Sequence, residues 1–395
     1  MITAGIVAEY NPFHLGHQYQ LTALRRTLGE DCAVVAVMSG NYVQRGDFAL
    51  LPKHLRAEMA LRCGVDLVLE LPTVCAMATA ETFARGAVGI LQAAGVVTHL
   101  CFGSECGDLA QLEAAAACLE GEDYQIALGA ALKQGGSFAA ARQRAAETAA
   151  GRPLPCLEGP NNNLGIEYLR ALRRFDSPIQ PVTVRRVGAA HDSREPSAEI
   201  ASASLLRRLT LAGEDAGAWM PPEAAKVLRR AAETGLAPAS LANCERAVLA
   251  VLRRMNEEDF RSYDGGGEGL YHRFYQAVGR AETVEALLAD CKTRRYAMSR
   301  LRRMLMAAYL GLEPQPPAPP YLRVLGATEQ GRVLLRRMKK EAALPVVTKP
   351  AGVRKLGRAA EDFLRRESRY TDLYALACPA PPPPGAEFTT DPVML

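Results

Sequence analysis

The chain has 395 residues, of which 49% are hydrophobic and 23% charged, and its formal net charge is +4 at pH 7. This length and composition predict a globular protein of two or three domains. The opening apolar run is too short and too interrupted for a secretion signal, and no segment approaches bilayer-spanning length. The ten cysteines include no CxxC pair. We therefore expect a cytoplasmic protein with reduced thiols, no membrane contact and no metal-ligating cluster.

The first 28 residues contain the most informative pattern. Residues 2–8 form an apolar run of buried-strand length that breaks at Asn11-Pro12, and a helix is expected from Gly16 onward. His14 and His17 lie three residues apart at the start of this helix, so both imidazoles can point the same way. Beside the free N–H groups of a helix N-terminus, they would hold a nucleotide triphosphate and stabilise charge at its α-phosphorus. The alternative is that the histidines only cap or pack; the order of strand, turn, HLGH and helix favours the phosphate site.

Strand and helix patterns then alternate along the chain. Strands are expected at 32–38, 65–71 and 96–102, with helices at 52–64 and 78–94. This alternation predicts an α/β fold with a doubly wound parallel sheet, whose ligand lies at the carboxyl ends of the strands. Three Ala-rich helical segments follow over 108–150, and we interpret them as packing elements.

Several candidate site residues fall where these strands end. They lie at 9–17, 39–45 and 103–105. Gly103 either lets the backbone approach a nucleotide or is a plain turn glycine. The asparagines 161–163 precede a helix expected at 164–174; asparagines there are usually caps, although their amides also suit a base or a ribose.

A fifth strand is expected at 179–186 and ends in Arg186. After it, Ser202 and Ser204 introduce a helix that carries Arg207, which gives a second helix N-terminus suited to phosphate. The alternative is a serine N-cap with a solvated arginine.

The strand pattern ends near residue 213. We expect three parts: a nucleotide-binding domain over 1–212, a mainly helical domain over 213–375, and a Pro-rich disordered tail over 376–395. Residues 1–150 carry 10 basic and 15 acidic side chains, whereas the rest of the chain carries 37 and 28. The basic second part either contacts a polyanion larger than a nucleotide or is a solvated helix surface.

The motifs together resemble one family. GIVAEYNPFHLGHQYQL resembles the HxGH signature of the nucleotidyltransferase superfamily, and the whole chain resembles the tRNA(Met) cytidine acetate ligase family. The matching pieces, in order, are EYNPFHLGH, MSGNYVQRGDFA, the helix with Lys53 and Arg56, GVDLVLELP, FGSE, PNNNLGIEYLRAL, VRRVGAAHD, IASASLLR, CKTRRYAMSRLRR and YLRVLGATEQGR.

This resemblance implies an ATP-dependent ligase that works in two steps. Acetate attacks the α-phosphate of ATP to give acetyl-adenylate and pyrophosphate, and the N4 amine of the wobble cytidine of elongator tRNA(Met) then takes the acetyl group to form N4-acetylcytidine. The resemblance makes His14 and His17 catalytic. The ATP-binding residues that it implies are Val7, Ala8, Glu9, Tyr10, Asn11, Pro12, Phe13, His14, Leu15, Gly16, His17, Gln18, Tyr19, Gln20, Gly103, Asn162, Arg186, Ser202, Ser204 and Arg207.

The resemblance also implies RNA contacts and small ligands. Backbone contacts to tRNA are expected from Lys292, Arg294, Arg295, Arg300, Arg302 and Arg303. Mg²⁺ is expected with the triphosphate rather than from a ligand cluster, and Lys53 and Arg45 are candidates for holding acetate. The sequence does not indicate an oligomeric state.

Two other functions fit parts of the sequence. The same fold could carry an adenylyltransferase that acts on a small phosphorylated metabolite without RNA, although such enzymes are usually a single small domain. The chain could also be an RNA-binding scaffold with an inactive nucleotide site, although His14, Gly16 and His17 are intact.

Overall fold

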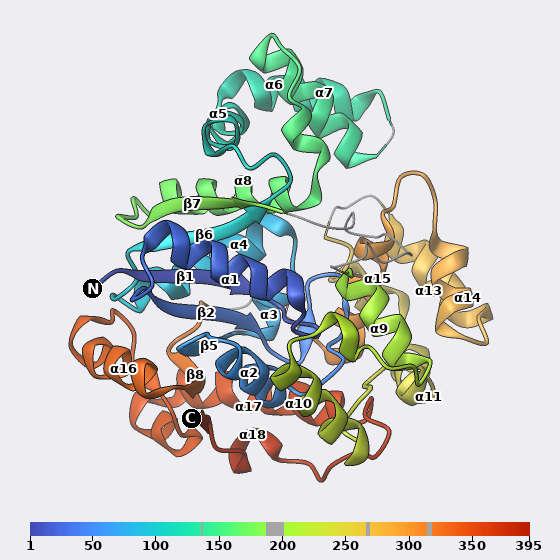
Figure 1. Ribbon diagram of the computed structural model, residues 1–395. Coiled ribbons are helices and arrows are strands. Elements are labelled where there is room, and N and C mark those ends of the chain that lie inside the picture. Colours follow the sequence, from blue (N-terminus) through green and yellow to red (C-terminus); the bar gives the residue numbers. More distant parts are fainter. Residues whose placement is uncertain (136, 187–200, 266–268, 314–317) are drawn as a thin grey trace.

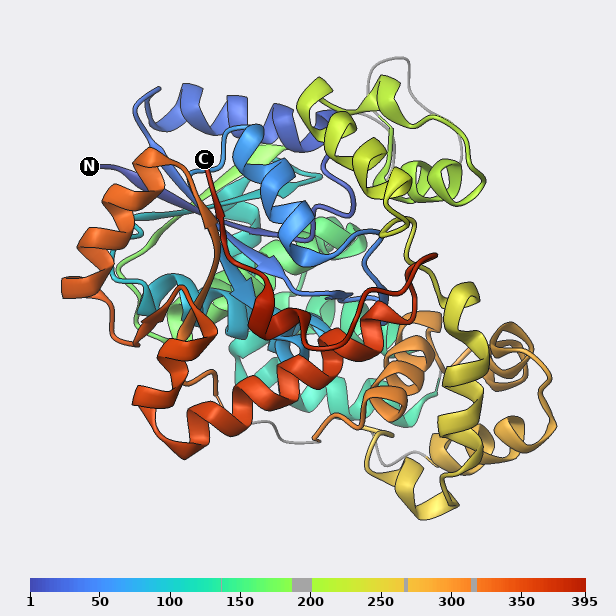
Figure 2. The same ribbon diagram turned by 90° about the horizontal axis from the view of Figure 1, so that it is seen from below.

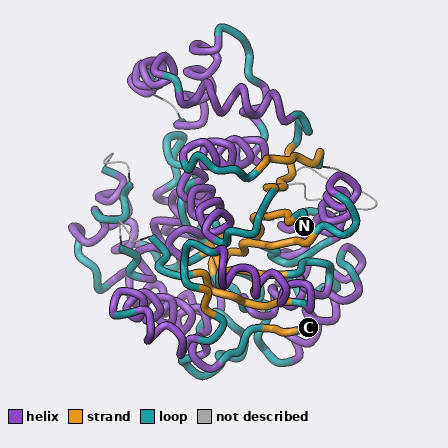
Figure 3. Tube along the Cα trace, turned by 90° about the vertical axis from the view of Figure 1, so that its left-hand side faces the viewer, coloured by secondary structure: helices purple, strands orange, loops and turns teal. Residues whose placement is uncertain are grey.

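The computed structural model describes the chain except residues 136, 187–200, 266–268 and 314–317. A twisted central sheet is covered by helices on both faces, with helical groups at its edges (Figures 1 and 3). No helix among the described residues is both long and apolar enough to cross a membrane.

The centre of the sheet consists of five parallel strands. In spatial order they are β5 (Leu67–Leu71), β2 (Ala33–Ser39), β1 (Thr3–Ala8), β6 (His99–Ser104) and β7 (Gln180–Arg185). The register pairs Gly5 with Val35 and with Leu100. The order reverses direction beside β1, which creates the crevice where doubly wound sheets bind ligands. The predicted α/β fold is therefore confirmed.

Both faces of the sheet are buried because its central strands are apolar at nearly every position. In β2, Val34, Ala36 and Met38 face α1 (Leu15–Leu28) and α2 (Lys53–Arg62). The alternate residues Val35 and Val37 face the opposite layer, which contains α4 (Ala80–Ala93), α8 (Pro160–Arg174) and α16 (Glu329–Glu341).

Helices outside the sheet form two groups. The predicted Ala-rich segments are α5 (Leu109–Glu120), α6 (Glu122–Lys133) and α7 (Phe138–Ala150), which stand above α8 in Figure 1. The second group consists of α11 (Leu241–Arg253), α12 (Glu257–Arg261), α13 (Leu270–Arg280), α14 (Val284–Cys291) and α15 (Met298–Leu310). Helices α9 (Ala203–Leu211) and α10 (Pro222–Glu233) instead share the core of α1 and α2. Helices α11 to α15 share a core around Val248, Phe260 and Phe274, which also includes Tyr42 and Tyr374.

The C-terminal part of the chain returns to the sheet. Strand β8 (Leu322–Ala327) pairs antiparallel with β5, and β10 (Val393–Met394) pairs parallel with β8. Between them lie β9 (Val346–Val347), α17 (Arg358–Ala375) and α18 (Ala386–Thr389). Figure 2 shows these last segments in orange and red beside the blue strands and α2.

Two expectations about domain organisation are corrected by this return. The part beyond residue 213 is not a separate helical domain, because β8 extends the sheet formed by β5, β2, β1, β6 and β7. Strands β3 (Tyr42–Val43) and β4 (Asp47–Phe48) form a separate two-stranded sheet. The expectation of a disordered tail over 376–395 is wrong, because α18 buries Glu387 and β10 adds a strand. The proline-rich composition of this segment did not indicate that it would pair with β8 and bury Glu387.

Candidate nucleotide-binding site

A cavity lies at the carboxyl ends of β1, β6 and β7, where the N-terminal turns of α1, α8 and α9 also meet. This is the edge at which parallel sheets place their ligands. The residues that line it are Val7, Ala8, Glu9, Tyr10, Asn11, His14, Gly16, His17, Tyr19, Gln20, Gln44, Arg45, Phe83, Phe102, Gly103, Asn161, Leu164, Tyr168, Val184, Arg185, Arg186, Ala201, Ser202, Ala203, Ser204 and Arg207.

The two histidines form the first turn of α1 and also face this cavity. Nδ1 of His14 accepts a hydrogen bond from the Gly16 N–H (3.0 Å), and Nδ1 of His17 accepts one from the His14 N–H (3.2 Å). The ring centroids are 3.8 Å apart. Because each Nδ1 is an acceptor, each neutral ring carries its proton on Nε2. Capping and ligand binding are therefore compatible: the same hydrogen bonds that cap the helix orient two Nε2–H donors.

Both histidines are held in the neutral state. Burial, together with the nearby positive charges of Arg186 and Arg207, lowers the pKa of His14 to about 3. Burial also lowers the pKa of His17, together with His14 and Arg186. At neutral pH the pair therefore donates hydrogen bonds as imidazole, and cationic charge in the cavity comes from arginine.

We expect the C–H resonances of His14 and His17 to keep their chemical shifts between pH 8 and pH 5 in the folded protein. The same resonances should titrate in urea, where the usual pKa near 6.5 applies. Because the unfolded chain takes up protons in this range and these folded rings do not, their contribution to stability should fall as the pH drops below 6.5. NMR of histidine-labelled protein measures both states, and a folded-state titration near pH 6.5 would contradict the assignment.

The chain that precedes α1 is held in an uncommon conformation. Tyr10 has φ = +44°, in the left-handed region. Its buried ring and the His17 ring are in a T-shaped arrangement, with their centroids 4.9 Å apart. The fully buried Arg56 donates to the backbone carbonyls of Glu9, Ser39 and Gly40, which joins the ends of β1 and β2. Arg56 lies in one of the family motifs, and its buried position gives it this structural role.

The start of α9 supplies further polar groups. Ser202 is the N-cap, and its hydroxyl accepts a hydrogen bond from the Leu205 N–H (3.2 Å). Arg207 donates to the Asn11 carbonyl (3.0 Å) and to the Ser204 hydroxyl (3.0 Å), so it connects α9 to the turn before α1. Capping again coexists with a place at the cavity, which puts a helix N-terminus and a guanidinium beside the histidines.

The opposite side of the cavity is formed by β6, β7 and α8. A Cβ at Gly103 would lie 3.2 Å from Cγ of Arg186, so glycine lets the arginine stem pass over the strand end. Glu105 accepts hydrogen bonds from the N–H groups of Asn161 (3.0 Å) and Asn162 (2.7 Å) and from the Asn161 side chain (2.7 Å). Burial alone would raise the pKa of Glu105, but these hydrogen bonds outweigh it and lower the pKa.

Most, but not all, of the residues expected to contact ATP line this cavity. Pro12, Phe13, Leu15, Gln18 and Asn162 do not. Phe13 is fully buried in the core, and the Asn162 side chain accepts hydrogen bonds from the Glu105 and Cys106 N–H groups, so Asn161 faces the cavity in its place. The prediction missed an apolar wall made of Phe83, Phe102, Leu164 and Tyr168; their hydrophobic patterning indicated only core.

The two candidates for holding acetate have different positions. Arg45 lines the cavity, on the loop that follows β2. Lys53 is only 2% exposed and pairs with Glu70 (2.7 Å) and Glu387 (2.5 Å) outside the cavity. The assignment of Lys53 to acetate is therefore corrected, because both of its carboxylate partners belong to the protein.

The basic residues expected to contact RNA differ in their surroundings. Arg302 pairs with Asp47 (2.8 Å), Arg303 donates to the Gln44 carbonyl (3.4 Å), and Arg300 pairs with Asp264 (3.1 Å). Lys292 donates to the carbonyls of Thr293 and Tyr296 (both 2.8 Å), whereas Arg294 and Arg295 are exposed. Residues 187–200, which include parts of VRRVGAAHD and IASASLLR, lie outside the described residues.

Comparison with known proteins agrees with this geometry. Residues 1–384 match the family described as HIGH Nucleotidyl Transferase. A tRNA(Met) cytidine acetate ligase from Acetivibrio thermocellus is 36% identical over 416 residues, with 100% of both chains covered. One from Syntrophotalea carbinolica is 39% identical over 402 residues, covering 96% of this chain and 95% of the relative.

Solved structures give the same result. Two crystal structures of Thermotoga maritima TmcAL, one apo and one bound with alpha-thio ATP, match with TM-scores of 0.95 and 0.93. Both are 33% identical to this chain, and 100% of each chain is covered. The resemblance read from the motifs is confirmed: the chain belongs to the tRNA(Met) cytidine acetate ligase family of HIGH nucleotidyl transferases.

Proposed function

We propose that this protein is an ATP-dependent ligase that acetylates N4 of the wobble cytidine of elongator tRNA(Met). The observation that carries the proposal is the pair of neutral imidazoles, 3.8 Å apart, at a helix N-terminus beside Arg186 and Arg207. Donors and cations gathered at one edge of a cavity suit a triphosphate. The relative of similar fold whose structure contains alpha-thio ATP supports the same ligand.

In the first step, an acetate oxygen would attack the α-phosphorus of ATP, and the bond to the bridging oxygen would break to release pyrophosphate. The Nε2–H groups of His14 and His17 would donate to phosphate oxygens as negative charge develops on them. Because the pKa of both rings lies far below neutral, the rings would stabilise this charge without transferring a proton. No covalent enzyme intermediate is needed.

In the second step, the N4 amine would attack the acetyl carbonyl, AMP would leave, and the nitrogen would lose one proton. Single-stranded loop bases are the readable part of an RNA, so an anticodon base can enter a site of this kind. We infer that Mg²⁺ would enter with the triphosphate, since Mg²⁺ usually binds phosphates and few protein groups. Among the described residues, no group of three or more His, Cys, Asp or Glu side chains is arranged to hold a metal ion.

The test is incubation of the protein with ATP, acetate and total tRNA, followed by mass analysis of the nucleosides. We expect N4-acetylcytidine only when all three substrates are present, and acetate-dependent exchange of pyrophosphate into ATP without tRNA. Exchange that requires a phosphate ester in place of acetate would instead indicate an adenylyltransferase. Binding of tRNA without acetyl-adenylate formation would indicate an RNA-binding protein.

Replacing both Arg294 and Arg295 by Ala should weaken tRNA binding without changing acetate-dependent pyrophosphate exchange. Both side chains are exposed, so each lost phosphate contact should reduce the slope of log K against log salt by roughly 0.7 to 0.9. Filter binding at several salt concentrations measures this slope. Arg302 and Arg303 are less suitable, because they contact the loop that lines the nucleotide cavity. An unchanged slope would place the RNA surface elsewhere.

A further inference from the structure

The loop that joins β2 to α2 is held by the C-terminal helix α17. Within this loop, which we call the 41–49 loop, the Tyr42 hydroxyl donates to the Tyr370 carbonyl (2.8 Å). The Tyr374 hydroxyl donates to the Ala49 carbonyl (2.9 Å). Both ends of the loop are therefore fixed by residues from the last part of the chain, far away in sequence.

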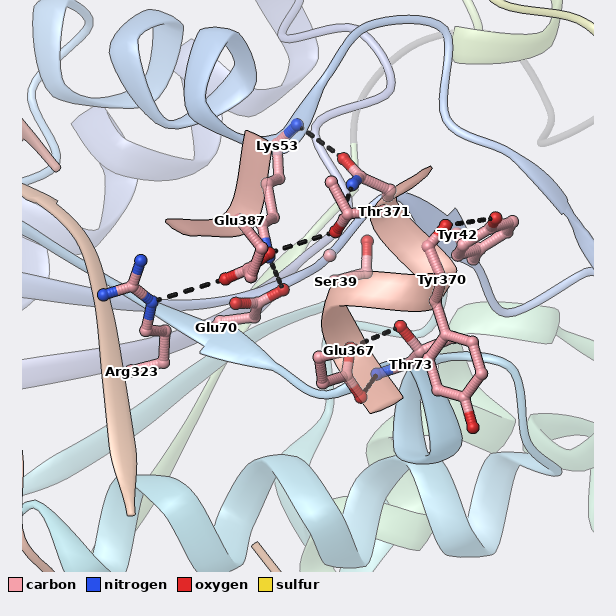
Figure 4. Close-up of polar contacts among 12 residues, drawn as sticks. Ser39, Tyr42, Lys53, Glu70, Thr73, Arg323, Glu367, Tyr370, Thr371 and Glu387 are labelled. Carbon is pink, nitrogen blue, oxygen red and sulfur yellow. Dashed lines mark hydrogen bonds and ion pairs between the residues drawn. The ribbon is translucent and has the colours of Figure 1, made fainter. Parts of the chain in front are cut away.

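A closed ring of hydrogen bonds fixes the start of this loop (Figure 4). The Asn41 amide donates to the Thr371 hydroxyl (3.2 Å), and the Thr371 hydroxyl donates to Glu387 (3.0 Å). Glu387 accepts from the Lys53 ammonium (2.5 Å), and the Lys53 backbone N–H donates to the Asn41 side chain (2.9 Å). Asn41, Lys53 and Glu387 are 4% exposed or less, so water cannot easily replace the two bonds that Lys53 makes to Asn41 and Glu387. Thr371 is half-buried.

The charges in and beside the ring stabilise one another. Burial alone would lower the pKa of Lys53, but Glu387 and Glu70 raise it, so the ammonium stays charged. Burial alone would raise the pKa of Glu387, but Lys53 and Arg323, the latter 3.6 Å away, lower it. A buried ion pair in which both partners remain charged fixes the positions of the groups bonded to it.

The same loop forms one side of the nucleotide cavity. Gln44 and Arg45 line the cavity, and the Gln44 N–H donates to the carboxylate of Glu9 at the end of β1 (2.7 Å). Arg186 and Arg207 reach the cavity from β7 and α9, whereas Arg45 brings positive charge from the β2 side. The position of this charge therefore depends on how the 41–49 loop is held.

We propose that Thr371 and Glu387 are positioning residues, which act through Asn41 to hold the 41–49 loop so that Arg45 meets the carboxylate of the small acid substrate. The role in acetate binding rests on the proposed function. Neither residue lines the cavity, and each acts only through the ring. The C-terminal segment is thus part of the machinery that orders the site.

The test compares Thr371→Val with Thr371→Ser in the full-length chain. Valine keeps the shape but removes the hydroxyl that links Asn41 to Glu387, whereas serine keeps the hydroxyl. Thr389→Val makes the same chemical change at an exposed position on α18, so it serves as the matched control. Two readouts are needed: hydrogen exchange of the backbone amides of residues 41–49, and KM for acetate and for ATP in pyrophosphate exchange.

We expect Thr371→Val to speed amide exchange in the 41–49 loop. It should also raise KM for acetate by about tenfold, the size expected for the loss of one hydrogen bond to a charged group. KM for ATP should change less. Thr371→Ser and Thr389→Val should behave as wild type. Unchanged loop exchange in Thr371→Val would overturn the positioning role, and equal rises in both KM values would overturn the link to the acid substrate. If wild-type protein shows no acetate-dependent exchange, the proposed function fails, while the amide measurement still decides the positioning role.

Discussion

Replacing His14 by Asn should reduce acetate-dependent pyrophosphate exchange by roughly 100- to 1,000-fold, comparable to the loss of one preorganised donor to a transition state. Asparagine is a good N-cap, so its side chain can still accept from the Gly16 N–H while the Nε2–H donor is lost. His17→Gln makes the equivalent change at the third helical position, where glutamine can still reach back to the His14 N–H.

This design separates chemistry from helix capping. His14→Ala removes both functions, so it should lose the same activity and in addition about 1 kcal/mol of stability, the usual effect of losing an N-cap. Thermal unfolding of the three variants measures the capping contribution, and exchange kinetics measure the donor. If His14→Asn exchanges pyrophosphate at a rate near that of wild type, the histidine pair only caps α1, and the proposed mechanism is incorrect.

Replacing Lys53 by Met should lower the free energy of unfolding by about 3 to 5 kcal/mol at pH 7, which is typical when one partner of a buried ion pair is removed. Lys53 is 2% exposed, and its loss leaves Glu70 and Glu387 buried beside each other without their shared cation. Urea denaturation followed by circular dichroism measures the change.

Lys226→Met is the matched control for this prediction. Lys226 also pairs with a glutamate, Glu223, at 2.6 Å, but this pair lies on the surface of α10, where ion pairs contribute little. The difference between the two variants should shrink at acidic pH, because protonation of Glu70 and Glu387 removes the excess negative charge, of which Arg323 compensates only part. A Lys53→Met variant as stable as Lys226→Met would show that the buried network has little net effect on stability.

The local elements were predictable because each is determined by its own residues. The apolar runs of β1, β2, β5 and β6 and the helices between them lie close to the expected ranges. The histidine pair was also visible, because a three-residue spacing at a helix start fixes the relative direction of two side chains. The position of Asn162 could not be predicted in this way. A shift of one residue in the first turn of α8 decides whether Asn161 or Asn162 faces the cavity.

The long-range parts could not be predicted in the same way. Nothing in the local sequence of β8 indicates that this strand pairs with β5. Glu387 lies just after a run of prolines, and its burial depends on Lys53 and Arg323, which come from distant parts of the sequence. Which charged residues pair with one another depends on the tertiary structure. Composition does not contain this information, and it therefore led to the mistaken prediction of a disordered tail.

The place of β8 in the sheet also affects how the protein can be synthesised. A long stretch of chain separates β8 from its partner β5, so β5 leaves the ribosome well before β8 does. Until then, the hydrophobic strand LVLEL has one edge without a partner, and such edges favour aggregation. We therefore expect nascent chains of this enzyme to need chaperone protection until β8 emerges. Refolding in vitro should be slow and should compete with aggregation at high protein concentration.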